Sequence, residues 1–223
     1  MRVLLLTDIH SSINYVEKLV SIVKDLFDLC IIAGDITHFG SVEEALSILK
    51  LLKSTAKKIL FVPGNCDPKE LLDYKMIDGE IINIHGRAVE ISGYTFYGIG
   101  GSNVTPFRTP IEFSEEELRE LISRASSVPA KKLVVITHAP PYKTLDKTFI
   151  GLHVGSKSLK HFLEEHRPIL WVSGHIHESR GIMRYGDEHG ETLIVNPGPL
   201  RKGYYAEARL GTEISVFLKE VRT

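Results

Sequence analysis

The sequence has little of several features that would place it in a special class of proteins. It contains only two cysteines, Cys30 and Cys66, among 223 residues, too few for a disulfide framework, so we expect a reducing, cytoplasmic location. No apolar run approaches the roughly 20 residues that span a bilayer. The opening MRVLLL is interrupted by Thr7 and Asp8 before it reaches the length of a signal-peptide core. We therefore expect no membrane association.

Neither positively nor negatively charged residues are in excess. Lysine and arginine together number 27 and aspartate and glutamate 28, which gives a formal net charge of -1. This balance provides no whole-molecule attraction to nucleic acid or to an anionic membrane. The hydrophobic share of 43% is that of an ordinary globular protein, and the length suits one large α/β domain. The sequence contains no repeat, low-complexity tract or linker, so residues 1–223 are predicted to form a single domain.

The first third of the chain predicts alternating strands and helices. Strands are expected at residues 3–6, 29–33 and 58–62, and helices at 16–27 and 42–52. Ser41 with Glu44 has the form of a helix-capping box. Apolar strands separated by amphipathic helices indicate a parallel sheet that is buried on both faces.

The rest of the chain is richer in strands. The patterns predict a hairpin at 87–91 and 94–99, buried strands at 132–137 and 169–172, consecutive strands at 181–185, 191–195, 204–210 and 213–221, and helices at 118–125 and near 159–163. Residues 139–156 lack periodicity, and structureless connections beyond about 12–15 residues are uncommon. This segment is either a functional loop or an ordinary surface loop.

Residues of metal-ligand type follow five of the predicted buried strands. They are Asp8 and His10 after the first strand, Asp35 after the second, Asn65 after the third, His138 after 132–137, and His175 and His177 after 169–172. In open α/β sheets the carboxyl ends of the strands line one crevice, where ligands bind. Five distant segments are therefore expected to bring carboxylates, an amide and imidazoles together.

These residue types and spacings suit a pair of divalent ions. Side chains two residues apart in an extended chain point the same way, so Asp8 and His10 can hold one centre together. The same applies to His175 and His177. Imidazole, carboxylate and amide ligands suit Mn, Fe, Zn or Co. Asp35 arrives alone and can bridge two ions with its two oxygens, and ions about 3.5–4 Å apart form the clamp used for in-line displacement at phosphorus.

The order D-x-H, G-D, G-N-x-D, H and G-H-x-H resembles that of the calcineurin-like metallophosphoesterase family. The resemblance extends from Asp8 to the N-P-G at Asn196–Gly198. It implies a mixed α/β fold, a two-sheet β-sandwich flanked by helices in an αββα arrangement, which agrees with the β-α-β start and the strand-rich end. The G-N-C-D variant around Cys66 is similar to that of a small bacterial and archaeal phosphodiesterase-like branch.

The resemblance also implies a site and an activity. One metal would be held by Asp8, His10, Asp35 and His177, and the other by Asp35, Asn65, His138 and His175. The nucleophile would be a metal-bridging hydroxide that attacks phosphorus in line. The implied function is a two-metal phosphoester hydrolase, with a phosphodiesterase on a small or nucleotide-like substrate as the leading prediction.

The chain departs from the family pattern at Cys66, where many members have a histidine that assists the leaving group. A thiol with an ordinary pKa of about 8.5 is a poorer acid at pH 7 than an imidazolium near 6.5. Cys66 is therefore either a residue on the leaving-group side or a small filler beside the metals. His153 and Lys147 are alternative proton donors, or solvated residues of the long loop. We expect a preference for leaving groups that depart with little protonation.

Two other functions stay open. A nuclease of the same superfamily is disfavoured by the neutral charge and by the lack of a lysine and arginine cluster with interleaved aromatics. A non-catalytic binding or assembly module is disfavoured because all seven predicted ligands are retained. The expected partner is a small-molecule phosphoester.

Overall fold

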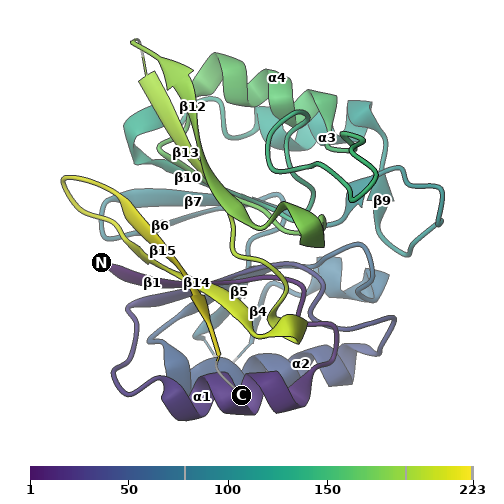
Figure 1. Cartoon of the computed structure of the whole chain (residues 1–223), viewed down its shortest axis with the longest axis vertical. Helices are drawn as coiled ribbons and strands as arrows, with labels where there is room; N and C mark the ends of the chain where they lie inside the picture. The colour runs from purple at the N-terminus through teal and green to yellow at the C-terminus, as the bar shows by residue number, and fades with distance from the viewer. Residues whose placement is uncertain (78, 189, 222–223) are drawn as a thin grey trace.

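Two β-sheets packed face to face, each covered by helices on its outer side, make up the fold (Figure 1). The computed structural model describes residues 1–77, 79–188 and 190–221. The sheets and helices follow one another as four layers, so the predicted αββα sandwich is confirmed. Within the described residues, no helix combines the length and the apolar character that crossing a bilayer requires.

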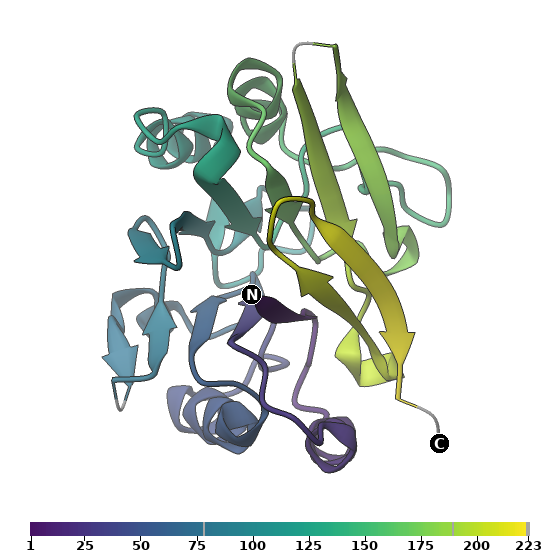
Figure 2. The ribbon, with the colours of Figure 1, turned by 90° about the vertical axis from the view of Figure 1, so that its left-hand side faces the viewer.

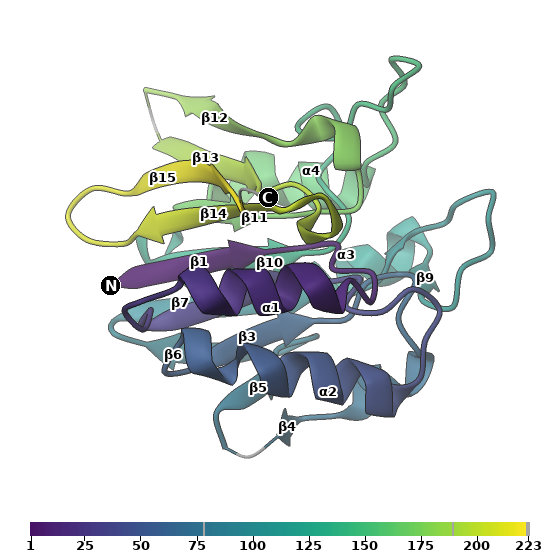
Figure 3. The same cartoon turned by 60° about the horizontal axis from the view of Figure 1, so that its bottom comes forward.

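The first sheet has seven strands in the order β15-β14-β1-β2-β3-β5-β4. Their bounds are β1 Arg2–Leu6, β2 Leu29–Ala33, β3 Ile59–Val62, β4 Met76–Ile77, β5 Ile81–Asn83, β14 Tyr204–Arg209 and β15 Ser215–Glu220. Strands β1, β2, β3 and β5 are parallel neighbours, and antiparallel pairing adds β14 and β15 on one side and β4 on the other. Helices α1 (Ile13–Ile22) and α2 (Val42–Leu51) lie side by side across its outer face (Figure 3).

The second sheet has six strands in the order β12-β13-β11-β10-β7-β6. Their bounds are β6 Ala88–Ile91, β7 Tyr94–Ile99, β10 Leu133–Thr137, β11 Leu170–Val172, β12 Gly181–Asp187 and β13 Gly190–Asn196. Helices α3 (Glu115–Ser123) and α4 (Lys157–His166) cover it. A short parallel pair, β8 (Ser102–Asn103) and β9 (Glu112–Phe113), stands apart from both sheets. The 3₁₀ turns are η1 Leu52–Thr55, η2 Lys69–Asp73, η3 Ala130–Lys132, η4 His177–Ser179 and η5 Leu200–Lys202.

Alternation along the strands assigns each side chain to one of three apolar layers. In β1, Val3 and Leu5 belong to the core between the sheets, whereas Leu4 and Leu6 pack against α1 and α2. Every residue of β2 and β10 is buried, because each strand lies inside a sheet that is covered on both faces. This burial explains the continuous apolar runs in the sequence.

The local signals were read correctly in most places, with identifiable exceptions. One half of the capping box predicted at Ser41 and Glu44 forms at α2, where the Ser41 side chain accepts a hydrogen bond from the Glu44 amide, and a complete box of Ser114 and Glu117 begins α3. The helix predicted over 16–27 ends at Ile22, and Phe27 reaches the core from beyond it. Strands β4, β5, β8 and β9 have only two or three residues, too few for an apolar pattern. No helix or strand occurs in residues 139–156, as expected.

Candidate metal centre

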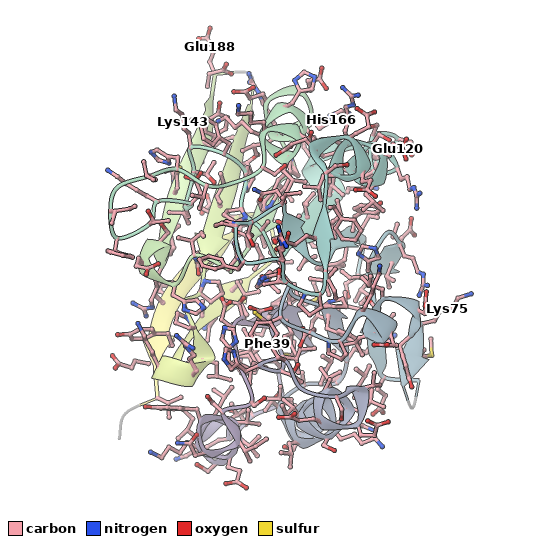
Figure 4. The ribbon with its side chains drawn as sticks, turned by 90° about the vertical axis from the view of Figure 1, so that its right-hand side faces the viewer. Phe39, Lys75, Glu120, Lys143, His166 and Glu188 are labelled. Atoms are coloured by element: carbon pink, nitrogen blue, oxygen red, sulfur yellow. The ribbon has the colours of Figure 1, made fainter. Side chains whose placement is uncertain are left out.

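The seven predicted ligands lie at the edge where strands of both sheets end. Asp8 and His10 follow β1, Asp35 follows β2, Asn65 follows β3, His138 follows β10, and His175 and His177 follow β11. Figure 4 views this edge, with Phe39 of the loop after β2 near its middle. Figure 2 views the opposite edge, where the N-terminus lies. The site is therefore built jointly by the two sheets, and the expected convergence of five segments is present.

Asp8, His10 and His177 form one group whose ligand atoms lie within 4.8 Å of one another. His10 Nε2 lies 3.2 Å from His177 Nε2, and His177 Nε2 lies 3.2 Å from Asp8 Oδ1. Asp8 Oδ1 is buried and has no well-aligned hydrogen-bond donor in the part of the chain that the structure describes. Lone pairs that face one another in this way need a proton or a cation between them. The residues fit a metal ion.

A second group joins Asp8 and Asp35 to His138. His138 Nδ1 lies 2.8 Å from the Ala33 carbonyl oxygen, so Nδ1 carries a hydrogen and Nε2 faces inward. There, Nε2 lies 2.9 Å from Asn65 Oδ1 and 3.4 Å from Asp35 Oδ2. Two oxygen acceptors and an imidazole nitrogen thus surround one point, which suits a cation.

Asp35 belongs to the second group, which shares Asp8 with the first, and one of its oxygens faces an imidazole of each group. Its Oδ1 accepts a hydrogen bond of 2.8 Å from the Cys66 amide. Its Oδ2 lies 3.5 Å from His10 Nε2 and 3.4 Å from His138 Nε2. The Cys66 amide thus fixes the orientation of the carboxylate, and bridging of two ions by Asp35 stays a prediction.

The electrostatics of the site favour deprotonated ligands, with one exception. Burial lowers the pKa of His10 and of His175 to about 4, so both imidazoles are neutral near pH 7. Burial opposes ionisation of Asp8 and Asp35, but the neighbouring histidines outweigh it and lower the pKa of each. Burial also opposes a charge on His138, yet Asp35 outweighs it and raises the pKa of His138 to about 9. Without metal, a proton on His138 takes the place of a cation.

His175 lies beside the site, outside the three-residue groups. Its ring is edge-on to that of His138, with 5.0 Å between the centroids. Its amide donates to Asp8 Oδ2 at 3.1 Å, which links the loops after β11 and β1. His175 thus lies next to the second group.

The loops that carry the site hold an unusual backbone conformation. Four of the predicted ligands have positive φ angles, namely Asp8 (51°), His10 (48°), Asp35 (51°) and His175 (65°). Such conformations cost about 1–3 kcal/mol each for residues other than glycine and cluster at functional sites. A Cβ atom on Gly64 would lie 2.0 Å from Asp35 Oδ1, so only glycine allows this approach of the two loops.

Asp67 of the G-N-C-D motif holds two of these loops together. Its carboxylate accepts hydrogen bonds from the amides of Gly64, Ile36 and Thr37 at 2.7, 3.1 and 2.7 Å, and from the Thr37 hydroxyl at 2.9 Å. The side chain is fully buried. This aspartate therefore supports the turns that present Asp35 and Asn65.

His38 is a further histidine at the site, and it was not among the predicted ligands. It forms a third group with His10 and Cys66, and its Nδ1 lies 3.3 Å from His10 Nδ1. Its position three residues after Asp35 was the available signal.

Burial, followed by the charge of Asp35, raises the pKa of the Cys66 thiol, which stays protonated.

The long loop lies against the segment that carries His177. The Lys147 amide donates to Ser179 Oγ at 2.8 Å, and that hydroxyl donates back to the Lys147 carbonyl. His153 Nδ1 lies 2.5 Å from the buried Asp146 Oδ1. Lys147 and His153, the predicted alternative proton donors, thus belong to a loop that is hydrogen-bonded to the 3₁₀ turn beginning at His177.

Comparison with known proteins agrees with the fold and the site. A family model for calcineurin-like phosphoesterases matches residues 1–179. An uncharacterized protein of Methanocaldococcus jannaschii is 39% identical over 214 residues, which cover 92% of this chain and 90% of that protein. A crystal structure of a Thermus thermophilus protein has a TM-score of 0.70 at 16% identity, with 99% of each chain covered, and shows the same fold.

The chain belongs to the calcineurin-like phosphoesterase family and is a metal-dependent phosphoesterase. A relative with a functional description is a probable glycerophosphodiester phosphodiesterase of Arcobacter nitrofigilis. It is 29% identical over 179 residues, which cover 76% of this chain and 64% of that protein. This chain therefore spans slightly less than two thirds of that relative.

Proposed function

We propose that this phosphoesterase uses two metal ions to hydrolyse a phosphodiester of a small or nucleotide-like substrate. The observation that carries the proposal is the place of Asp35 Oδ2, between His10 Nε2 at 3.5 Å and His138 Nε2 at 3.4 Å. A single carboxylate oxygen that faces imidazoles of both ligand groups suits a pair of ions. The similarity to a probable glycerophosphodiester phosphodiesterase supports a diester over a monoester.

The proposed ligands divide into two sets that share Asp35. One set is Asp8, His10, Asp35 and His177, and the other is Asp35, Asn65, His138 and His175. Mn, Fe, Zn and Co all suit these donors. Bound ions would supply a hydroxide nucleophile at neutral pH and neutralise charge on the phosphoryl oxygens. With two carboxylates facing two divalent ions, the site would keep a charge of about +2 and attract an anionic diester.

The chain itself prepares this site before any ion binds. The Ala33 carbonyl holds His138 with Nε2 directed inward, and the Cys66 amide holds Asp35 with Oδ2 toward both groups. Little reorganisation is then needed on binding. Cys66 stands on the proposed leaving-group side, and its protonated thiol is a weak acid, so substrates with good leaving groups are preferred.

Two further proposals concern the whole chain. We propose that residues 1–223 form one domain, because β14 and β15 extend the sheet that contains β1. We also propose a reducing cellular compartment, because Cys30 and Cys66 are both free thiols.

The test is a substrate panel on protein reconstituted separately with Mn, Fe, Co and Zn. The panel holds aryl and alkyl phosphodiesters, phosphomonoesters and single-stranded DNA and RNA. We expect turnover of small diesters, and loss of bound metal together with activity in Asp35→Asn and His177→Ala. Unchanged turnover in either variant would refute the assigned site, and salt-sensitive cleavage of nucleic acid alone would replace the proposed substrate class.

A further inference from the structure

The Asn65 side chain has two different ends, and the structure orients them. Its Oδ1 faces His138 Nε2 at 2.9 Å, on the metal side. Its Nδ2 points away, 3.1 Å from Thr109 Oγ1 and 3.7 Å from Cys66 Sγ. Only the oxygen of an amide can bind a metal ion in its neutral form, because the nitrogen carries two hydrogens and no available lone pair. The direction of this amide therefore decides whether Asn65 is a ligand.

Glu112 determines which way the Thr109 hydroxyl points. Glu112 Oε1 accepts from Thr109 Oγ1 at 2.7 Å and from the Thr109 amide at 2.8 Å. Burial opposes the charge on Glu112, but hydrogen bonds from Thr105 and Thr109 outweigh it and lower its pKa to about 2. Glu112 is thus an acceptor only, so the Thr109 hydroxyl donates to it and turns a lone pair toward Asn65 Nδ2.

We propose that Thr109 and Glu112 are positioning residues that keep the Asn65 oxygen, and not its NH₂ group, turned toward the metal site. The chain of hydrogen bonds has one direction, from Asn65 Nδ2 to Thr109 and from Thr109 to Glu112. Without it, the Thr109 hydroxyl could donate to the amide oxygen and stabilise the reversed amide. The inference rests on the proposed function, because the direction of Asn65 matters only if Asn65 is a ligand.

The same carboxylate organises the loop between β8 and β9, which projects beyond the sheets (Figure 3). Thr105 Oγ1 donates to Glu112 Oε1 at 2.6 Å, and the Thr105 amide donates to Oε2 at 3.2 Å. Thr105 has no hydrogen bond to Asn65 among those of the described residues. It therefore shares the loop-building role of Thr109 without the orienting one, which makes it a matched control.

Four variants separate the orienting role from a structural one. Thr109→Val removes the acceptor for Asn65 Nδ2, Thr109→Ser keeps it, and Glu112→Ala frees the hydroxyl to rotate. Thr105→Val removes another donor to Glu112 from a residue that has no hydrogen bond to Asn65. Binding of Mn²⁺ is followed by calorimetry and by elemental analysis after gel filtration, and the magnetic coupling of the ion pair by electron paramagnetic resonance. Thermal unfolding of the metal-free proteins confirms that each variant is folded.

We expect Thr109→Val to lower the affinity for one of the two ions by about 10–100-fold, which is the usual effect of removing a partner that orients a ligand. Glu112→Ala should lower the affinity for the same ion by a smaller factor. The affinities of Thr109→Ser and Thr105→Val should stay within a few-fold of the wild-type value. Wild-type binding in Thr109→Val, or an equal loss in Thr105→Val, would overturn the positioning role.

Asn65→Ala distinguishes this inference from the proposed function. If Asn65→Ala loses one ion and Thr109→Val does not, only the positioning role is wrong. If Asn65→Ala keeps both ions at wild-type affinity, the proposed ligand set itself is wrong, and the positioning role is overturned with it.

Discussion

Replacement of Asp35 by asparagine is expected to weaken binding of both ions strongly without unfolding the protein. The Cys66 amide donates to Oδ1 at 2.8 Å, so the asparagine oxygen should keep that place and the NH₂ group should take the place of Oδ2. Its hydrogens would then point at the region between His10 Nε2 and His138 Nε2, where the native oxygen lies 3.5 and 3.4 Å from them. The change removes a ligand and a charge from both proposed ions at once.

The size of the effect follows from the burial of this carboxylate, which is 2% exposed. Removing one partner from a buried charged group costs about 3–5 kcal/mol. Since about 1.4 kcal/mol is a factor of ten, affinity should fall by roughly a hundred- to several-thousand-fold for each ion. The variant should also lose the raised pKa of His138, because the Asp35 charge is its main favourable cause.

The assay is calorimetric titration of the metal-free variant with Mn²⁺, with circular dichroism as the check on folding. Asp28→Asn is the matched control, because Asp28 pairs with Lys57 Nζ at 2.8 Å and directly precedes β2, at the opposite end of that strand from Asp35. Two ions bound to a folded Asp35→Asn at wild-type affinity would refute the reasoning.

Three further outcomes are expected. Because the folded pKa of His138 is about 9, above its ordinary 6.5, its proton stabilises the metal-free protein below pH 6.5, and this contribution is lost as pH rises through 9. Metal binding at pH 7 should release that proton, and the metal affinity should rise by up to about a hundredfold toward pH 9. Calorimetric titration in buffers of different ionisation enthalpy would measure the proton release, and a metal affinity that does not depend on pH would contradict this expectation. Gly64→Ala, whose Cβ would lie 2.0 Å from Asp35 Oδ1, should lower metal affinity and cost about 1–3 kcal/mol of stability in thermal unfolding; wild-type values for both would show that the loops give way. Rates of diester hydrolysis should fall steeply as the leaving-group pKa rises, and Cys66→His should make this dependence flatter. A flat dependence in the wild type would contradict a role of Cys66 on the leaving-group side.

The sequence was sufficient to predict which residues gather, because one simple rule applies to all of them. Each predicted ligand follows a buried strand, and parallel strands end at a common edge. The burial of β2 and β10 could be predicted from their continuous apolar runs. The chain's membership of the phosphoesterase family agrees with this prediction.

The details that determine the chemistry could not be predicted in the same way. That Asp35 presents a single oxygen depends on the Cys66 amide, a backbone group 31 residues away that no side-chain pattern reveals. The contact of Asn65 with Thr109 spans 44 residues and depends on a loop without apolar periodicity. His38 is next to His10 only because the loops after β1 and β2 pack together. These contacts come from tertiary packing of turns.

Anomalous diffraction from crystals of the manganese-loaded protein tests the central claim most directly. The account predicts two manganese peaks about 3.5–4 Å apart, with Asp35 Oδ2 bound to both. One peak should contact Asp8, His10 and His177, and the other should contact Asn65, His138 and His175. A single peak, or manganese bound away from Asp35, would contradict the account.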